Sequence, residues 1–147
     1  MILHDNFTIR TSHPEMYQEL QQNKKLFELQ IHIFVSALAI GILNNLKSQE
    51  SPHRDIIKLW QLKDNLKEYR DMINIISQII CEGKNERDCS HELLAYADGG
   101  LEFLWKEYQA QGTLDLPRIL EEAKKKWSKR IPELLASLRC TYASKSE

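Results

Sequence analysis

The fold of this chain is decided by residues 89–108, which read CSHELLAYADGGLEFLWKEY. Apolar residues recur in this stretch at steps of three and four, the spacing of one face of an α-helix. They are Leu93, Leu94, Ala97, Leu101, Leu104, Trp105 and Tyr108. The pattern predicts a helix over residues 90–111, and Gly112 is a residue type that typically ends a helix.

Gly99 and Gly100 fall in the middle of this predicted helix. Each glycine costs roughly 1 kcal/mol relative to alanine in a helix interior, so the fold must recover that free energy. A close crossing with another helix in the core would recover it. A partner or ligand pressed against the glycines would also recover it, and a kink at this point is the third alternative.

Residues 26–46 form the most apolar segment of the chain. Polar residues interrupt its first half, which leaves a run shorter than the roughly 20 apolar residues that a membrane span needs. The segment is therefore predicted to be a central helix that other helices surround. Helical spacing also predicts helices over residues 65–81 and 116–129, a short helix over 14–22 capped by Ser12, and a last one from Pro132 to Tyr142.

Residues 7–11 read FTIRT and alternate as a strand would. Residues 55–60 fit either a helical turn or a small extended piece, so no second convincing strand is available for pairing. We therefore expect an extended N-terminal arm over residues 1–11 and a frayed tail over 143–147. The predicted fold is all-α, one domain over residues 1–147, built as a bundle of five to six helices.

Composition narrows the class of protein. The 147 residues are 42% hydrophobic and 28% charged, which is typical of a globular protein. The net charge of -1 gives no global basic field for nucleic acid, so any DNA contact must come from a local patch. The N-terminus shows neither a basic region nor a long apolar run, so no signal peptide is predicted.

The three cysteines, Cys81, Cys89 and Cys140, are an odd number at irregular spacing. This pattern does not predict a disulfide framework, and reduced thiols in the cytoplasm are the expectation. Cys81, Cys89 and His91 do not match the spacing of zinc ligands, so no metal site is predicted. No cofactor is predicted either.

The sequence contains no phosphate-binding GxxxxGK[ST] loop, no HExxH and no GxSxG. Its histidines are scattered without a nucleophile or carboxylate at the spacing of a catalytic motif. We therefore expect no catalytic residues and a chain that is not an enzyme. A small enzyme of unknown type remains a third class, and it would need a concave site with perturbed titrating groups.

One cluster of basic residues is a candidate DNA-binding surface. It consists of Lys124, Lys125, Lys126, Lys129 and Arg130. Five cations within seven residues would supply several contacts to the phosphates of double-stranded DNA. The alternative is a solvated helix end whose cations complement the helix dipole and pair with Glu121 and Glu122.

The aromatic residues of the central stretch are candidate anchors for a core or an interface. The residues predicted to contact a partner are Tyr96, Gly99, Gly100, Phe103 and Trp105.

The segment from Tyr96 to Leu104, which reads YADGGLEFL, resembles the small accessory protein family found beside DNA phosphorothioation (Dnd-type) modification and restriction genes in prokaryotes. Residues 27–41 and 114–119 share the resemblance, which covers roughly residues 17–120. It implies a non-catalytic cytoplasmic component of a defence system against foreign DNA, and no catalytic residues are carried over. By analogy, related helical subunits accompany SMC-like ATPases in other defence systems.

These observations predict an accessory subunit in a hetero-oligomer with a larger ATPase or nuclease, with auxiliary contact to double-stranded DNA. Neither a membrane nor a small-molecule substrate is expected as a partner. The alternative function is a free-standing helical DNA-binding regulator.

Overall fold

A computed structural model of the chain describes residues 3–129. The contacts divide the chain into two compact units, Met1–Leu114 and Asp115–Glu147. The sequence predicts one domain over residues 1–147. The contacts of the chain fall into these two units, and each unit is described by itself. The helix predicted from Pro132 and the frayed tail lie outside the described residues.

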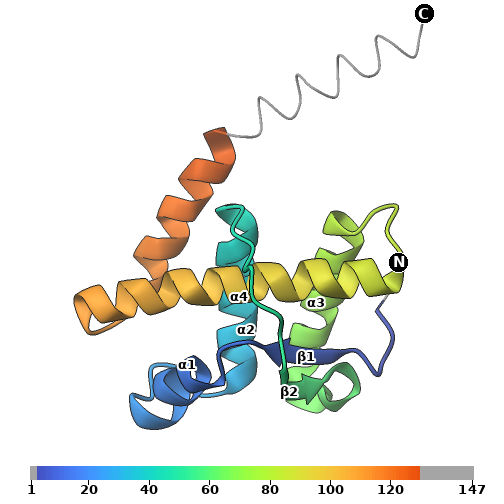
Figure 1. The fold of residues 1–147 in the computed structure, drawn as a ribbon, viewed down its shortest axis with the longest axis horizontal. Helices are drawn as coiled ribbons and strands as arrows, with labels where there is room; N and C mark the ends of the chain where they lie inside the picture. Colours follow the sequence, from blue (N-terminus) through green and yellow to red (C-terminus); the bar gives the residue numbers. More distant parts are fainter. Residues whose placement is uncertain (1–2, 130–147) are drawn as a thin grey trace, which may run out of the picture. The chain divides into compact units, whose positions relative to one another are not determined.

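The first unit contains two strands and several helical elements (Figure 1). In chain order they are β1 (Thr8–Thr11), α1 (Pro14–Gln18), the π-helix η1 (Glu19–Asn23), α2 (Gln30–Leu43), β2 (Arg54–Lys58), the 3-10 turns η2 (Leu59–Gln61) and η3 (Asp64–Leu66), α3 (Lys67–Ile80) and α4 (Glu86–Gln111). In the second unit, residues 116–129 are helical, as predicted. The prediction of a largely helical chain is confirmed, and a small sheet accompanies the helices.

Among residues 3–129 the longest helix is α4, and it begins earlier than the sequence pattern indicates. The Asn85 side chain accepts a hydrogen bond from the Asp88 backbone N–H at 2.8 Å, which caps the helix at residue 86 instead of 90. At the other end Gly112 adopts a φ of 73°, the left-handed conformation that ends a helix. The predicted C-terminal end is therefore confirmed, and the predicted start is wrong by about one turn.

Gly100 lies where α4 crosses α2 (Figure 1), and Gly99 lies against Leu46 and Lys47, just after the end of α2. A Cβ atom at Gly100 would lie 1.8 Å from the Ala37 carbonyl oxygen, and one at Gly41 would lie 1.9 Å from the Tyr96 carbonyl oxygen. A Cβ atom at Gly99 would lie 2.3 Å from the Leu46 carbonyl oxygen. The backbones therefore touch, and of the three alternatives for the glycines the close helix crossing is the one observed.

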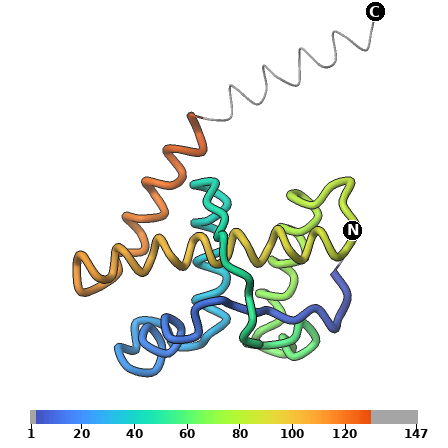
Figure 2. Tube along the Cα trace, in the orientation of Figure 1, coloured from blue at the N-terminus to red at the C-terminus, as the bar shows by residue number. Residues whose placement is uncertain are grey.

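Residues 8–11 form a paired strand, so the prediction of an extended N-terminal arm is wrong for these residues. β1 pairs with β2 in an antiparallel sheet, from Thr8 opposite Lys58 to Thr11 opposite Arg54, with an irregularity between Ile9 and Arg10. Figure 2 shows the segment after α2 running back beside the N-terminal segment, where β2 pairs with β1. Residues 54–58 contain only two residues that favour strands, so the sequence does not identify β2 as a partner for β1. The path of the chain around α2 brings the two strands together.

Two cysteines form a disulfide bond, so the prediction of reduced thiols is wrong for Cys81 and Cys89. Cys81 follows the last residue of α3, and Cys89 lies in the first turn of α4. The short connection between α3 and α4 brings the Cα atoms of Cys81 and Cys89 to 5.2 Å from each other, within the range for a disulfide. Both side chains are buried in the core.

The core of the first unit joins β1, α2, α3 and α4. Its fully buried side chains include Ile9, Phe34, Leu38, Ile73 and Leu93. Within residues 3–129, no helix has both the length and the apolar character needed to cross a membrane.

Candidate partner-binding surface

Helix α3 buries one side and leaves apolar residues on another. Ile73 and Ser77 are buried, and Ile73 belongs to the core. On the outer side Met72, Ile75 and Ile79 are 44%, 58% and 71% exposed. They follow one another at steps of three and four, so with the partly buried Ile76 they form a continuous stripe, which we name the α3 apolar face.

A groove runs between this face and α2. It has a volume of about 220 Å³, and only apolar residues line it. They are Ala39, Ile42 and Leu43 of α2 with Ile76, Ile79 and Ile80 of α3. We name it the α2/α3 groove. The exposed stripe and the groove together make one apolar surface that the first unit does not cover.

The sequence contains a signal for this surface. Six of the fourteen residues of α3 are isoleucine or methionine, namely Met72, Ile73, Ile75, Ile76, Ile79 and Ile80. At 100° per residue they spread over about half of the helix circumference, more than one contact with a core occupies. Helical spacing predicts the helix itself, and only the tertiary contacts separate its buried part from its exposed part.

The residues that the sequence predicts to contact a partner do not form one surface. Gly99 and Gly100 are buried against the chain's own backbone, which accounts for them without a partner. Tyr96 is half-buried, and Lys47 Nζ lies 5.1 Å from the centre of its ring. Phe103 and Trp105 are also half-buried, and the spacing along α4 places Trp105 on the side opposite Tyr96, where it packs against Tyr108.

The predicted DNA-binding cluster lies in the second unit. Lys124, Lys125, Lys126 and Lys129 are all exposed on the helix of residues 116–129. Lys124 Nζ lies 3.6 Å from Glu121 Oε1, so part of the basic charge is offset locally. Arg130 lies outside the described residues.

A polar cluster that the sequence analysis missed joins β1 to α4. Asp98, only 1% exposed, accepts hydrogen bonds from Thr11 Oγ1 at 2.7 Å, from Ser12 N–H at 2.9 Å and from Ser12 Oγ at 2.8 Å. These bonds satisfy a carboxylate in the interior, which would otherwise be costly to bury. The prediction that Ser12 caps α1 is therefore wrong, because its hydroxyl is used by Asp98.

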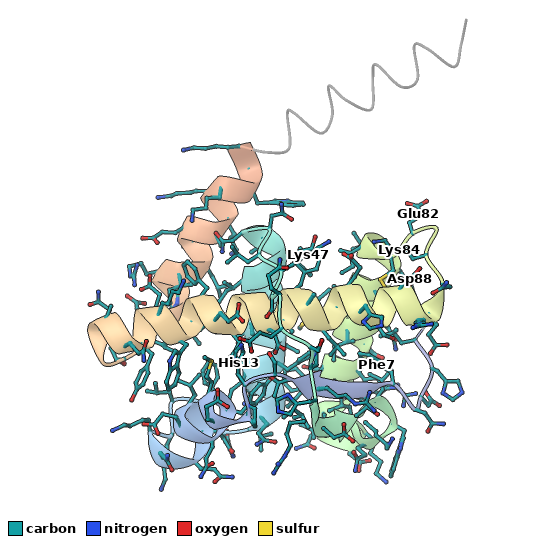
Figure 3. The ribbon with its side chains drawn as sticks, viewed as in Figure 1. Phe7, His13, Lys47, Glu82, Lys84 and Asp88 are labelled. Carbon is teal, nitrogen blue, oxygen red and sulfur yellow. A yellow bond between two sulfur atoms is a disulfide. The ribbon has the colours of Figure 1, made fainter. Side chains whose placement is uncertain are left out.

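The next residue extends the cluster to the surface. His13 Nε2 lies 2.7 Å from Glu102 Oε2, and Ser48 Oγ donates to the same oxygen at 2.8 Å. Figure 3 shows His13 beneath α4, the helix that carries Glu102. Burial lowers the pKa of His13, but the hydrogen bond with Glu102 and the charges of Glu102, Asp98 and Glu50 outweigh burial and raise it.

This histidine and carboxylate are 89 residues apart, so no local motif shows them. The contacts of Glu102 with His13 and Ser48 hold the turn before α1 and the loop at Ser48 against α4. A cavity of about 540 Å³ lies nearby, lined among others by Glu15, Tyr17 and Arg54, but neither His13 nor Glu102 lines it. The cluster therefore joins parts of the fold to one another and does not line this cavity.

Residues 3–129 contain no group of three or more histidine, cysteine or acidic side chains placed to hold a metal ion. The α3 apolar face carries three of the five exposed large hydrophobic side chains of residues 3–129, so it is the candidate binding surface. No family model, no curated protein and no solved structure matches this chain.

Proposed function

We propose that this chain is a non-catalytic accessory subunit that holds a larger partner through its helix surfaces. The partner is an SMC-like ATPase or a nuclease of a prokaryotic, cytoplasmic DNA-targeting defence complex. The observation that carries the proposal of a protein partner is the α3 apolar face, whose residue Ile79 is 71% exposed. The resemblance of residues 96–104 to the phosphorothioation-associated family supports the identity of the complex.

The exposed stripe is energetically suited to an interface. Fully burying an isoleucine or methionine side chain contributes roughly 1.5 to 3 kcal/mol. Because Met72, Ile75 and Ile79 are each about half exposed or more, covering them would supply several kcal/mol by the same scale. A few such anchors usually dominate the binding free energy of an interface.

The disulfide bears on the compartment. Disulfides are rare in cytoplasmic proteins, where thiol reductants keep cysteines reduced. The Cys81 and Cys89 side chains are 1% and 0% exposed, so an attacking thiolate reaches them only after local opening. Burial slows reduction of the bond once it has formed, whereas forming the bond requires an oxidant.

Co-expression with neighbouring genes tests the proposal. The full chain is produced together with each protein whose gene flanks its own, and the products are separated by size-exclusion chromatography with mass measurement. We expect a stable complex with one large neighbour. A monodisperse monomer in every pairing would contradict the proposal.

The second candidate function is a free-standing DNA-binding regulator. It is favoured by the exposure of Lys124, Lys125, Lys126 and Lys129 on one helix. It predicts that the isolated chain binds double-stranded DNA with an affinity that falls steeply with salt. Lys125→Glu combined with Lys126→Glu should weaken that binding, and an unchanged DNA mobility at low salt rejects this candidate.

A further inference from the structure

Acidic residues accompany the α3 apolar face along its length. Glu68 precedes Met72 by four residues, and Asp71 precedes Ile75 by four, so each acid lies one turn from a stripe residue on the same side of the helix. Glu82 follows the helix end and points away from the fold (Figure 3). All three are exposed. The stripe therefore has an acidic border.

The neighbouring cations are paired with other acids or lie on the side of the border away from the stripe. Within the part of the chain that the structure describes, Arg70 pairs with Asp5, and Lys84 Nζ lies 3.4 Å from Glu92. Lys67 is exposed, but at 100° per residue it lies on the far side of Asp71 from the stripe. The ion pairs of residues 3–129 involve neither Glu68 nor Asp71.

We propose that the α3 apolar face binds a basic amphipathic helix of a partner protein. The apolar side of that helix packs on Met72, Ile75 and Ile79 and enters the α2/α3 groove, and its flanking Lys or Arg residues face Glu68, Asp71 and Glu82. The inference rests on the proposed function, because it names the surface and the class of partner segment that the accessory subunit holds.

The dimensions of the stripe define the ligand. From residue 72 to residue 79 a helix rises about 10 Å, or two turns. A helix that crosses or follows this stripe presents apolar anchors at i, i+3, i+4 and i+7, the pattern by which amphipathic helices fill apolar grooves. Basic residues beside these anchors complement the acidic border and oppose the binding of acidic helices.

Synthetic peptides test the inference. The probe is an 18-residue helical peptide with leucine at i, i+3, i+4 and i+7 and lysine beside the leucines. A second peptide has glutamate in place of every lysine, and a third has the lysine peptide's residues in scrambled order. Binding to the full chain is measured by fluorescence anisotropy at two salt concentrations, and the bound region is mapped by hydrogen exchange. We expect the lysine peptide to bind at least about tenfold more tightly than both others, with protection on α2 and α3.

Matched variants locate the site. Ile79→Asp should weaken binding of the lysine peptide by about tenfold or more, whereas Trp60→Asp, the same charge change at an apolar residue of η2 that is 45% exposed, should not. Asp71→Lys should narrow the preference for the lysine peptide over the glutamate peptide, whereas Glu28→Lys, of equal charge change, should leave it intact. Circular dichroism confirms that each variant is folded.

Three results would overturn the inference: equal binding of the lysine and glutamate peptides, protection confined to other elements, or a self-association of the chain that Ile79→Asp abolishes. The last result would assign the face to a second copy. The proposed function fails separately. A neighbour complex that survives Ile79→Asp refutes this surface and leaves the accessory role standing, whereas specific peptide binding with no neighbour complex refutes the accessory role alone.

Discussion

The crossing of α2 with α4 and the outer side of α3 use opposite kinds of residue. At the crossing, Gly41, Gly99 and Gly100 let backbone meet backbone, and a single added Cβ atom would lie within 2.3 Å of a carbonyl oxygen. On α3, large side chains extend into open space, and Ile75 is 58% exposed. Small residues thus mark where this chain closes on itself, and large exposed ones mark where it remains open to another molecule.

The difference extends to how each helix is held. α4 packs closely against α2 where the two helices cross, and hydrogen bonds of Asp98 with Thr11 and Ser12 join it to β1 and the residue after it. α3 is held by fewer contacts, among them Ile73 in the core and the disulfide at its end. Changes at the crossing should therefore act on stability, and changes on the outer side of α3 should act on binding.

The largest effect on stability is expected at the crossing. Gly100→Ala places a Cβ atom 1.8 Å from the Ala37 carbonyl oxygen, so the two helices must separate. We expect a loss of about 3 kcal/mol or more in the free energy of unfolding, measured with urea. Gly83→Ala is the control: its Cβ atom meets nothing within 4 Å, and its φ of 78° costs only about 1 to 2 kcal/mol. Equal losses would show that the crossing is not tightly packed.

Two isoleucines of α3 allow its buried and exposed sides to be compared, because Ile73 lies on the buried side and Ile79 on the exposed side. Ile73→Ala removes a fully buried side chain and should lower the free energy of unfolding by about 2 to 5 kcal/mol. Ile79→Ala should change it by no more than about 0.5 kcal/mol, because the side chain is 71% exposed. Urea unfolding of both variants under one set of conditions makes the comparison. A large loss for Ile79→Ala would mean that the apolar face is covered in the isolated protein.

The disulfide determines how firmly the end of α3 is tied to α4. The sequence separation of 8 between Cys81 and Cys89 corresponds to a loop-closure contribution of about 2.5 kcal/mol. The double variant Cys81→Ala with Cys89→Ala should lose about this much stability. Reductant should lower the unfolding midpoint of the wild type and leave that of the double variant unchanged. If thiol titration under denaturing, non-reducing conditions finds three free cysteines per chain, the bond is absent.

The smallest effect is expected from His13. Its folded pKa is raised above the ordinary value of 6.5, so the protonated form stabilises the fold. This contribution is fully present below about pH 6.5 and is lost as the pH rises through the folded pKa. The stability difference between wild type and His13→Gln should therefore be greater at pH 6 than at pH 8.5, by less than about 1.4 kcal/mol per unit of pKa shift. A difference that grows with pH would contradict the protonated His13–Glu102 pair.

Local sequence patterns predicted the helices well, but they did not predict the contacts between segments that are distant in the sequence. The apolar spacing of residues 93–108 and the stop at Gly112 identified α4, because a helix of 26 residues repeats its period many times. The start of α4 was missed, because a cap depends on one side chain, that of Asn85. The strand pairing, the disulfide and the His13–Glu102 pair were all missed, since each joins residues whose meeting depends on the path of the chain.

The sequence by itself determined that this chain is largely helical, because helical periodicity is written in the order of neighbouring residues. It also marked Gly99 and Gly100 as the point of a helix crossing, a partner contact or a kink, and the structure shows that the crossing is the one present. Only the tertiary structure decided which apolar residues of α3 are core and which are surface. The physical reason is that helical spacing defines a side of a helix, whereas burial of that side depends on how far the neighbouring helices extend over it.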